Sequence, residues 1–436
     1  MAKINISKEF KTFSQGSAIS FVLMGFIGVV NLAIRLLLQR NLSNVNYGFF
    51  YSALALVLLI LSFSDLGLGQ ALTILTAKAN KHNDKNLIKM QFTNIMQLKL
   101  LLAIILSLLI LAFSPLIVKY YLHSSDKYCM FIVLLPAILF QSMNNGYTSF
   151  LVGLKKYALR NLLLLFVSLI WILLIFLTIF LFNKNVLLFA STYSLASLIV
   201  LLLTFFYFKD ARVNLLKKAS MNSYKKITKF CSYLAISTAL LTSMYYLDTI
   251  MLTSLKGLNS SANYNMALPV MQIVLSAMVF VNVFTPIASE LWVKKDYFQL
   301  KIFANIALLL AFAALPIVYF IFNYIGSDII KLLYKTENYE NLGITVTILC
   351  CGMVFFTLNN FLVQMLNSGH LEKKVAIITI NGFIINLLLN FILIKSYDYN
   401  GAALATALTY FIMSVMSYLL IKKSIATYES KSKLKE

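Results

Sequence analysis

The sequence predicts an all-α integral membrane protein of about twelve transmembrane helices, arranged as two six-helix halves. Of its 436 residues, 60% are hydrophobic and 12% are charged, whereas a soluble domain carries roughly 25% charged residues. Many apolar runs reach the length of about 20 residues that crosses a bilayer as a helix. Segments rich in Lys and Arg alternate with segments that have few of them. These observations exclude a soluble enzyme, a disordered chain and a coiled coil.

Twelve apolar runs define the expected helices, and each is long enough to span the hydrocarbon core. In chain order the expected spans are 14–39, 47–74, 95–118, 128–151, 159–182, 186–207, 230–254, 264–292, 302–324, 342–365, 376–394 and 400–421. The first run is too long for a signal-peptide core, so we interpret it as a membrane helix. The short connections leave no space for a sizeable soluble domain.

Positive charge distinguishes the two sides of this topology. The segments on the side of both termini hold 28 Lys and Arg, counting Lys99 at the start of its span, and the opposite segments hold eight. Because cytoplasmic loops carry the excess of Lys and Arg, we expect both termini in the cytoplasm. The net charge of +22 indicates contact with anionic membrane lipids rather than nucleic acid, since no basic stretch is interleaved with aromatic residues.

The longest connection, a basic segment, divides the helices into two sets of six. The expected parts are an N-terminal half at 1–207, a cytoplasmic linker at 208–229, a C-terminal half at 230–421 and a basic cytoplasmic tail at 422–436. Asn144-Asn145 precedes Asn359-Asn360 by 215 residues, and Asn46-Tyr47 precedes Asn263-Tyr264 by 217 residues. Six helices per half return the chain to the same side, so we interpret the offset as a parallel pseudo-two-fold repeat.

The sequence carries no motif of an enzyme active site: it has no GxSxG, no Walker loop and no HExxH. Its four Cys and three His lack metal-ligand spacing, so we predict neither a metal nor a cofactor. An envelope enzyme would need a sizeable loop on the non-cytoplasmic side, where the largest connection is the short segment 324–341. We therefore predict that the protein is not an enzyme, and keep a membrane-embedded polysaccharide polymerase as a third alternative.

A charged residue inside a membrane helix is a candidate for function. Arg35 lies in the first span, with Asn31 one turn before it and Gln39 one turn after it. This polar stripe predicts that Arg35 faces the interior of the bundle and binds substrate. The alternative is that Arg35 extends to the nearby interface, because the helix ends close to Gln39.

Two acidic residues also fall within expected spans. Asp65 lies in the second span and Asp248 in the seventh. Each is a candidate for ion coupling or for a structural polar contact. For Asp65 the structural alternative is a partner for Arg35 or Arg40, and for Asp248 it is an acid at the interface near the helix end.

Amide side chains line one helix in each half. Gln141 and Asn145 lie in the fourth span, and Asn360 and Gln364 lie in the tenth. Amides donate and accept hydrogen bonds at once, which suits a cavity that accommodates sugar hydroxyls. Interhelical hydrogen bonding is the alternative use of such residues in a membrane.

Several motifs in this order resemble those of the bacterial polysaccharide flippases, a family of the multidrug/oligosaccharidyl-lipid/polysaccharide exporter superfamily that also includes the MATE drug exporters. The motifs are Arg40, Tyr47-Gly48, Asp65-Leu66-Gly67-Leu68-Gly69, Leu247-Asp248, Tyr264, Ala267, Pro286, Asn386-Leu387-Leu388-Leu389-Asn390 and Gly401-Ala402-Ala403-Leu404-Ala405-Thr406. The resemblance spans nearly the whole chain. One departure is Ile394-Lys395-Ser396, where the family usually carries a Pro.

The resemblance implies a MATE-like fold and a flippase in the bacterial inner membrane. Its cargo would be an undecaprenyl-pyrophosphate-linked oligosaccharide repeat unit, such as an O-antigen unit, moved to the periplasmic leaflet by alternating access. Arg35 would meet the pyrophosphate or an acidic sugar, and the amides would accommodate the glycan. Expected partners are membrane lipids, a proton or sodium counter-ion and polysaccharide polymerase or assembly proteins. The alternative is an ion-coupled small-molecule drug exporter of the MATE type.

Overall fold

The computed structural model describes most of the chain, and its described residues form helices and turns with no strand. The described residues are 6–81, 83–181, 185–208, 221–276, 288, 290–334 and 339–433. Side chains are described over 22–81, 83–181, 185–208, 238–272, 288, 290–334 and 340–430. The all-helical membrane class that the composition predicts is thereby confirmed.

The chain divides into two compact units that the linear order alone does not delimit. The first comprises Met1–Asn46 and Leu56–Ala239, and the second comprises Tyr47–Ala55 and Leu240–Glu436. The first nine residues of this second unit thus come from an early helix of the chain. The expected boundary segment 208–229 lies mostly outside the described residues, so the six-plus-six division stays a prediction.

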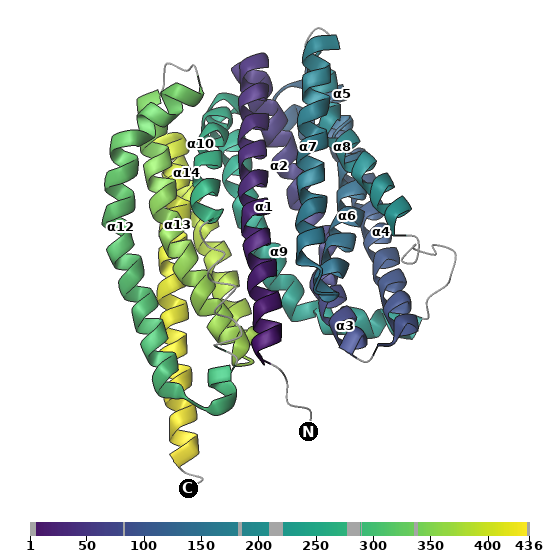
Figure 1. Cartoon of the computed structure of the whole chain (residues 1–436). Coiled ribbons are helices and arrows are strands. Elements are labelled where there is room, and N and C mark those ends of the chain that lie inside the picture. The colour runs from purple at the N-terminus through teal and green to yellow at the C-terminus, as the bar shows by residue number, and fades with distance from the viewer. Residues whose placement is uncertain are drawn as a thin grey trace. The chain divides into compact units, whose positions relative to one another are not determined.

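Helices before residue 208 build most of the first unit. They are α1 Ile6–Asn41, α2 Asn44–Asp65, α3 Leu68–Lys81, α4 Lys85–Leu116, a π-helical turn at Ile117–Tyr121, a 3-10 turn at Ser125–Lys127, α5 Tyr128–Ile132, α6 Pro136–Gly153, α7 Tyr157–Leu181 and α8 Val186–Tyr207. Within this unit α1 runs beside α7, and α6 packs against α3, α4 and α8 (Figure 1). A core of apolar side chains from α3, α4 and α6, which includes Phe92, Tyr147 and Phe150, holds these three helices together.

The later helices build most of the second unit. They are α9 Met221–Lys256, α10 Leu258–Ser276, α12 Tyr297–Leu333, α13 Tyr339–Ser368 and α14 Glu372–Lys433. The part of α9 up to Ala239 belongs to the first unit. In this unit α13 packs between α12 and α14, and α10 also contacts α13 and α14. Helix α14 is long because it joins the expected spans 376–394 and 400–421 across a kink at Asp398, where φ is 53° and ψ is −133°. The two expected helices are therefore both present, and the break between them lies at Asp398, inside the expected connection.

Nine helical segments of the described residues are long and apolar enough to cross a membrane. They cover the expected spans one to six, nine and ten, and the eleventh and twelfth together as α14. Helices α9 and α10 occupy the positions of the expected seventh and eighth spans. The count of twelve stays a prediction.

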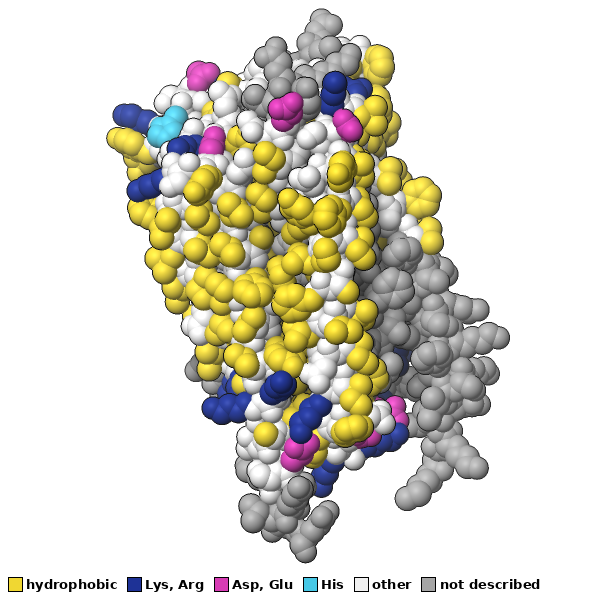
Figure 2. Space-filling view, turned by 90° about the vertical axis from the view of Figure 1, so that its left-hand side faces the viewer, with side chains coloured by type: hydrophobic (Ala, Val, Ile, Leu, Met, Phe, Trp, Pro, Cys, Tyr) yellow, Lys and Arg dark blue, Asp and Glu magenta, His cyan; other side chains and the backbone are white. Residues whose placement is uncertain are grey.

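Helix α12 shows how the second unit faces lipid. Along its 37 residues the exposed side chains are mostly large and apolar, among them Phe298, Leu309 and Phe320. Figure 2 shows a band of hydrophobic side chains on this face, with Lys, Arg, Asp and Glu gathered toward its two ends. Such a band between charged rims is the pattern of a surface that lies in a bilayer.

The expected second span, 47–74, is broken in the structure. Helix α2 ends at Asp65, and Leu66 and Gly67 adopt left-handed backbone angles with φ of 38° and 71°. Helix α3 then begins at Leu68 and continues to Lys81, into the segment expected to be a loop. Glycine tolerates positive φ without a steric cost, so the Asp-Leu-Gly-Leu-Gly motif encodes a change of direction that apolar periodicity does not register.

The expected fourth span, 128–151, is also interrupted. The short helix α5 ends at Ile132, and α6 begins at Pro136. Proline lacks an N–H donor and its φ is preset for a helical start, so it is favoured at the first position of a helix. The proline expected to lie within a helix therefore marks the beginning of one.

Candidate functional site

A buried cluster of polar side chains surrounds Asp248 in the second unit. The Asp248 side chain on α9 is 2% exposed. Its Oδ2 accepts hydrogen bonds from the Tyr264 hydroxyl of α10 and the Thr406 hydroxyl of α14, each at 2.6 Å. Its Oδ1 accepts a hydrogen bond from the Asn390 amide of α14 at 2.8 Å. One carboxylate thus joins the consecutive helices α9 and α10 to α14, which is distant in sequence.

A second layer of hydrogen bonds positions the Asn390 amide. Asn390 Nδ2 also donates to Asn386 Oδ1 at 3.2 Å, one turn earlier on α14. The Asn386 amide donates in turn to the hydroxyls of Thr406 and Thr409, at 3.5 and 3.4 Å. The spacing of four residues between the two asparagines places them on one face of the helix. Asn390 Oδ1 is buried without a hydrogen-bond partner in the described part of the chain.

The Asp248 carboxylate is stabilised by hydrogen bonds from neutral donors. Within the described residues, the hydrogen-bond donors to this carboxylate are two hydroxyls and one amide, and none of them belongs to Lys, Arg or His. A buried anion is expensive unless it is paired or fully hydrogen-bonded. The cluster therefore provides oxygen atoms, the carboxylate and the unpartnered Asn390 Oδ1, of the kind that hold a small cation or a proton.

A small pocket in the second unit opens beside this cluster. Its lining includes Asp248, three tyrosines and several apolar side chains of α9, α10, α13 and α14. The tyrosines are Tyr245, Tyr264 and Tyr410. Aromatic faces next to a carboxylate suit a cation or a hydroxyl-rich group better than an anion.

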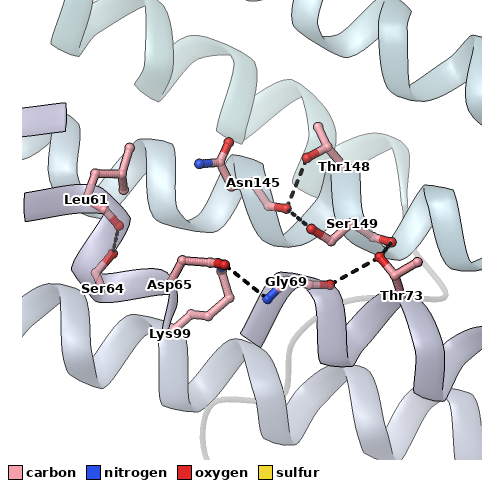
Figure 3. Close-up of polar contacts among 9 residues, drawn as sticks. All are labelled: Leu61, Ser64, Asp65, Gly69, Thr73, Lys99, Asn145, Thr148 and Ser149. Atoms are coloured by element: carbon pink, nitrogen blue, oxygen red, sulfur yellow. Dashed lines mark hydrogen bonds and ion pairs between the residues drawn. The ribbon is translucent and has the colours of Figure 1, made fainter. Parts of the chain in front are cut away.

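In the first unit, an ion pair lies at the break between α2 and α3. Lys99 Nζ of α4 pairs with Asp65 Oδ1, and the backbone N–H of Gly69 in α3 donates to Asp65 Oδ2 at 3.3 Å. Figure 3 shows these groups together, with the Thr73 hydroxyl bridging Gly69 O and Ser149 O of α6. The partner of Asp65 is Lys99, not Arg35 or Arg40 as the structural alternative expected.

Lys99 lies deeper in its helix than the sequence analysis expects. It was assigned to the cytoplasmic end of its span, yet its side chain is 0% exposed and it is the fifteenth residue of α4. Asp84 caps this helix by accepting from Leu87 N at 2.9 Å. An N-cap aspartate ahead of a helical run was the signal that would have placed Lys99 about four turns inside the helix.

The polar stripe of α1 makes a contact with α7. Ser168 of α7 donates to Asn31 Oδ1 at 3.1 Å, within the first unit. Arg35 lies one turn further on and is half-buried. The binding role of these two residues stays a prediction.

The amides of the two halves lie in different units. Gln141 Oε1 on α6 accepts from the Ser197 hydroxyl of α8 at 3.2 Å. The half-buried Asn145 accepts through its backbone carbonyl from Thr148 and Ser149, and its amide points away from the Asp65–Lys99 pair in Figure 3. Asn360 and Gln364 are half-buried on α13 of the second unit. A shared glycan cavity stays a prediction.

In the described part of the chain, no three His, Cys, Asp or Glu side chains form a group that could hold a metal ion. The oxygen-rich cluster around Asp248 contains one acid only. In the sequence, Tyr264, Asn390 and Thr406 are visible only as parts of motifs, because they lie up to 158 residues away from Asp248. Their common feature in the sequence is a polar side chain within a long apolar run.

Comparison with known proteins places the chain in a family. The model of the family described as "Polysaccharide biosynthesis protein" matches residues 14–292. An uncharacterized membrane protein of Methanocaldococcus jannaschii is 27% identical over 415 residues, which cover 89% of this chain and 80% of that protein.

Solved structures of membrane transporters share the fold. An inward-facing multidrug resistance MATE family transporter of the MOP superfamily has a TM-score of 0.76 at 14% identity, over 95% of this chain and 99% of that chain. A MOP superfamily transporter from Pyrococcus furiosus has a TM-score of 0.68 at 14% identity, with 95% and 96% covered. The Vibrio cholerae MATE transporter VcmN has a TM-score of 0.67 at 12% identity, with 95% and 98% covered. The chain therefore has the MATE fold and belongs to the polysaccharide biosynthesis protein family.

Proposed function

We propose that this protein translocates polyprenyl-pyrophosphate-linked oligosaccharide repeat units across the cytoplasmic membrane, from the cytoplasmic to the outer leaflet. The observation that carries the proposal is the match to a polysaccharide biosynthesis family in a chain with a transporter fold. A family of polysaccharide assembly needs a step that moves hydrophilic sugar across lipid. A polytopic helical protein without an enzyme motif suits that step.

Polar residues of both units suit the pyrophosphate and the sugars of such a cargo. A pyrophosphate leaving water needs a fixed cation or an equivalent set of donors. Arg35 is half-buried on α1, beside Asn31, whose amide oxygen is held by Ser168. We assign Arg35 to the pyrophosphate or to an acidic sugar, and Gln141, Asn145, Asn360 and Gln364 to sugar hydroxyls.

The cluster around Asp248 suits a coupling ion. Its carboxylate is buried, three helices converge on it, and the adjacent Asn390 Oδ1 accepts no hydrogen bond from the described residues. A cation bound there would compete for the oxygen atoms that accept hydrogen bonds from α10 and α14, so its binding and release would favour different packings of these helices against α9. We therefore propose that a proton or sodium ion at Asp248 biases the conformational equilibrium of the second unit.

A second candidate function is export of a cationic or aromatic small molecule. The pocket beside Asp248 favours it, because Tyr245, Tyr264 and Tyr410 line the pocket together with the carboxylate. This environment attracts an organic cation through charge and ring faces. A site for a pyrophosphate would be expected to present cations instead.

Reconstituted proteoliposomes distinguish the two functions. Fluorescent undecaprenyl-pyrophosphate oligosaccharide is placed in the leaflets, and a glycosidase added outside reports the fraction that reaches the outer leaflet. We expect the protein to raise that fraction, and we expect lipid recovered before the glycosidase is added to keep its chemical structure. A parallel assay follows ethidium efflux from the same vesicles. Ethidium transport without oligosaccharide translocation would overturn the proposal, and a changed lipid structure would indicate an enzyme.

A further inference from the structure

The ion pair between Lys99 and Asp65 in the first unit has two unequally exposed partners. The side chain of Lys99 is 0% exposed, while that of Asp65 is 32% exposed (Figure 3). The pair therefore reaches the surface of the unit through its carboxylate. This arrangement differs from the Lys301–Glu429 pair of the second unit, in which both side chains are exposed by more than a third.

The ammonium of Lys99 retains unused donors. An ammonium has three N–H donors, and within the described residues the structure gives it one acceptor, Asp65 Oδ1. A fully buried cation with two spare donors is poorly satisfied in a membrane protein. An anion with several oxygen atoms would satisfy it better than the single oxygen of Asp65 does.

Two glycines allow α3 and α6 to approach the pair closely. A Cβ at Gly69 of α3 would lie 3.2 and 3.3 Å from the two carboxylate oxygens of Asp65. A Cβ at Gly146 of α6 would lie 2.2 Å from Met96 Sδ and 3.5 Å from Lys99 Cε. Larger residues at either position would crowd the charged groups. The backbones of α3 and α6 thus pack closely on the pair, and the Met96 side chain lies beside Gly146.

The carboxylate is attached where the backbone changes direction. Asp65 is the last residue of α2, and the left-handed residues Leu66 and Gly67 follow at once. Among the described residues, the hydrogen bond given to its second oxygen is the 3.3 Å bond from Gly69 N. Asp65 can therefore rotate away from Lys99 without breaking the regular hydrogen bonds of either helix.

We propose that Lys99 binds the anionic group of the cargo and that Asp65 occupies this place in the empty transporter. The inference rests on the function proposed above, and it names an oxyanion, either a phosphate oxygen or a sugar carboxylate, as the group bound. A buried ammonium has to keep an anionic partner, because an unpaired charge there is costly. Exchange of one oxyanion for another keeps the charge of Lys99 neutralised. The Asp65 carboxylate, which is already 32% exposed, is hydrated when it moves away from Lys99.

Binding to the full-length protein in lipid nanodiscs tests the exchange. The probes are undecaprenyl pyrophosphate with undecaprenol as its neutral control, and a glucuronate-containing oligosaccharide with its neutral analogue. We expect Asp65→Asn to tighten binding of the anionic probe by about threefold, since the internal competitor is removed, and Lys99→Met to weaken it by roughly tenfold or more. Glu429→Gln, which removes the acid of the Lys301 pair, is expected to leave binding unchanged. The probe that responds to Lys99→Met identifies the source of the oxyanion.

A purely structural clamp predicts different results. In that case Asp65→Asn and Lys99→Met both weaken binding and both lower the midpoint of thermal unfolding. This result would overturn the inference, and so would wild-type binding by Lys99→Met. If Lys99→Met does not fold, the double variant Asp65→Asn/Lys99→Met is used in its place, because it carries no unpaired charge. Wild-type binding by the double variant would also overturn the inference. Glycan translocation by Lys99→Met at the wild-type rate overturns this inference alone. A wild-type protein that translocates no oligosaccharide and binds no anionic probe overturns both proposals.

Discussion

Asn390 of α14 donates a hydrogen bond of 2.8 Å to Asp248 of α9 across 142 residues of sequence. Together with Tyr264 and Thr406, it surrounds a buried carboxylate with neutral donors. Substitution of Asp248 by Ala tests the structural role of this carboxylate, and substitution by Asn tests the role of its charge.

Asp248→Ala is expected to destabilise the protein strongly. It leaves three buried donors without their acceptor, and each unsatisfied group costs about 1–3 kcal/mol. The midpoint of thermal unfolding in detergent should fall clearly below that of the wild type. Asp248→Asn keeps an acceptor, and the neighbouring hydroxyls can accept from its amide. We expect Asp248→Asn to retain most stability and to lose the response of transport to a proton or sodium gradient. An unchanged gradient response would exclude Asp248 as the coupling site.

Arg35→Ala is expected to abolish or strongly reduce surface glycan at a normal level of protein in the membrane. Loss of a charged partner from a buried pair costs about 3–5 kcal/mol, which corresponds to weakening of binding by roughly a hundredfold or more, and partial wetting reduces this effect. Arg35→Lys should retain part of the activity because the charge remains but the planar group does not. Surface glycan and membrane protein are measured in the same cells. Full glycan with Arg35→Ala would identify Arg35 as an interfacial anchor.

The amides are tested by replacing Asn145 and Asn360 with Leu, singly and together. Leu preserves side-chain size but offers no hydrogen bond to a sugar hydroxyl. We expect reduced glycan export while the protein still inserts, measured as surface glycan per amount of membrane protein. Normal export by both variants would indicate that these amides serve helix packing.

Helix packing in the second unit depends on Gly343 of α13. A Cβ there would lie 2.7 Å from the backbone nitrogen of Ser327 and 2.8 Å from its Cα, on α12. Because a backbone cannot move aside easily, Gly343→Ala should destabilise the protein by about 1–3 kcal/mol. Gly25→Ala on α1 is the matched control, since a Cβ at Gly25 meets no atom within 4 Å. Equal unfolding midpoints for the two variants would contradict the close approach of α12 and α13.

Orientation in the membrane is predicted from the charge distribution. Lys99 lies inside α4, so the two sides carry 27 and eight Lys and Arg instead of 28 and eight, and the expected orientation does not change. A single cysteine introduced between residues 208 and 229 of an otherwise cysteine-free protein should react with a membrane-impermeant maleimide only after the cytoplasmic face is exposed. Labelling in intact cells would invert the topology.

The sequence alone was sufficient for the class of this protein and for most of its helices. Apolar runs of membrane length follow directly from composition, because every backbone group in lipid must be bonded within the helix. The family was also evident from motifs such as Asp65-Leu66-Gly67-Leu68-Gly69. The apolar pattern did not predict the helix break within that motif, because the apolar run continues through the left-handed residues Leu66 and Gly67.

Only the tertiary structure decided which polar residues meet. Asp65 and Asp248 were visible in the sequence, but their partners Lys99 and Asn390 lie 34 and 142 residues away. A polar residue in an apolar run has to find a partner on another helix, and the sequence of one helix does not state which neighbour lies beside it. The placement of Lys99 shows this most clearly. Its charge made it look like a loop residue, whereas packing of α4 against α3 and α6 buries it beside a carboxylate.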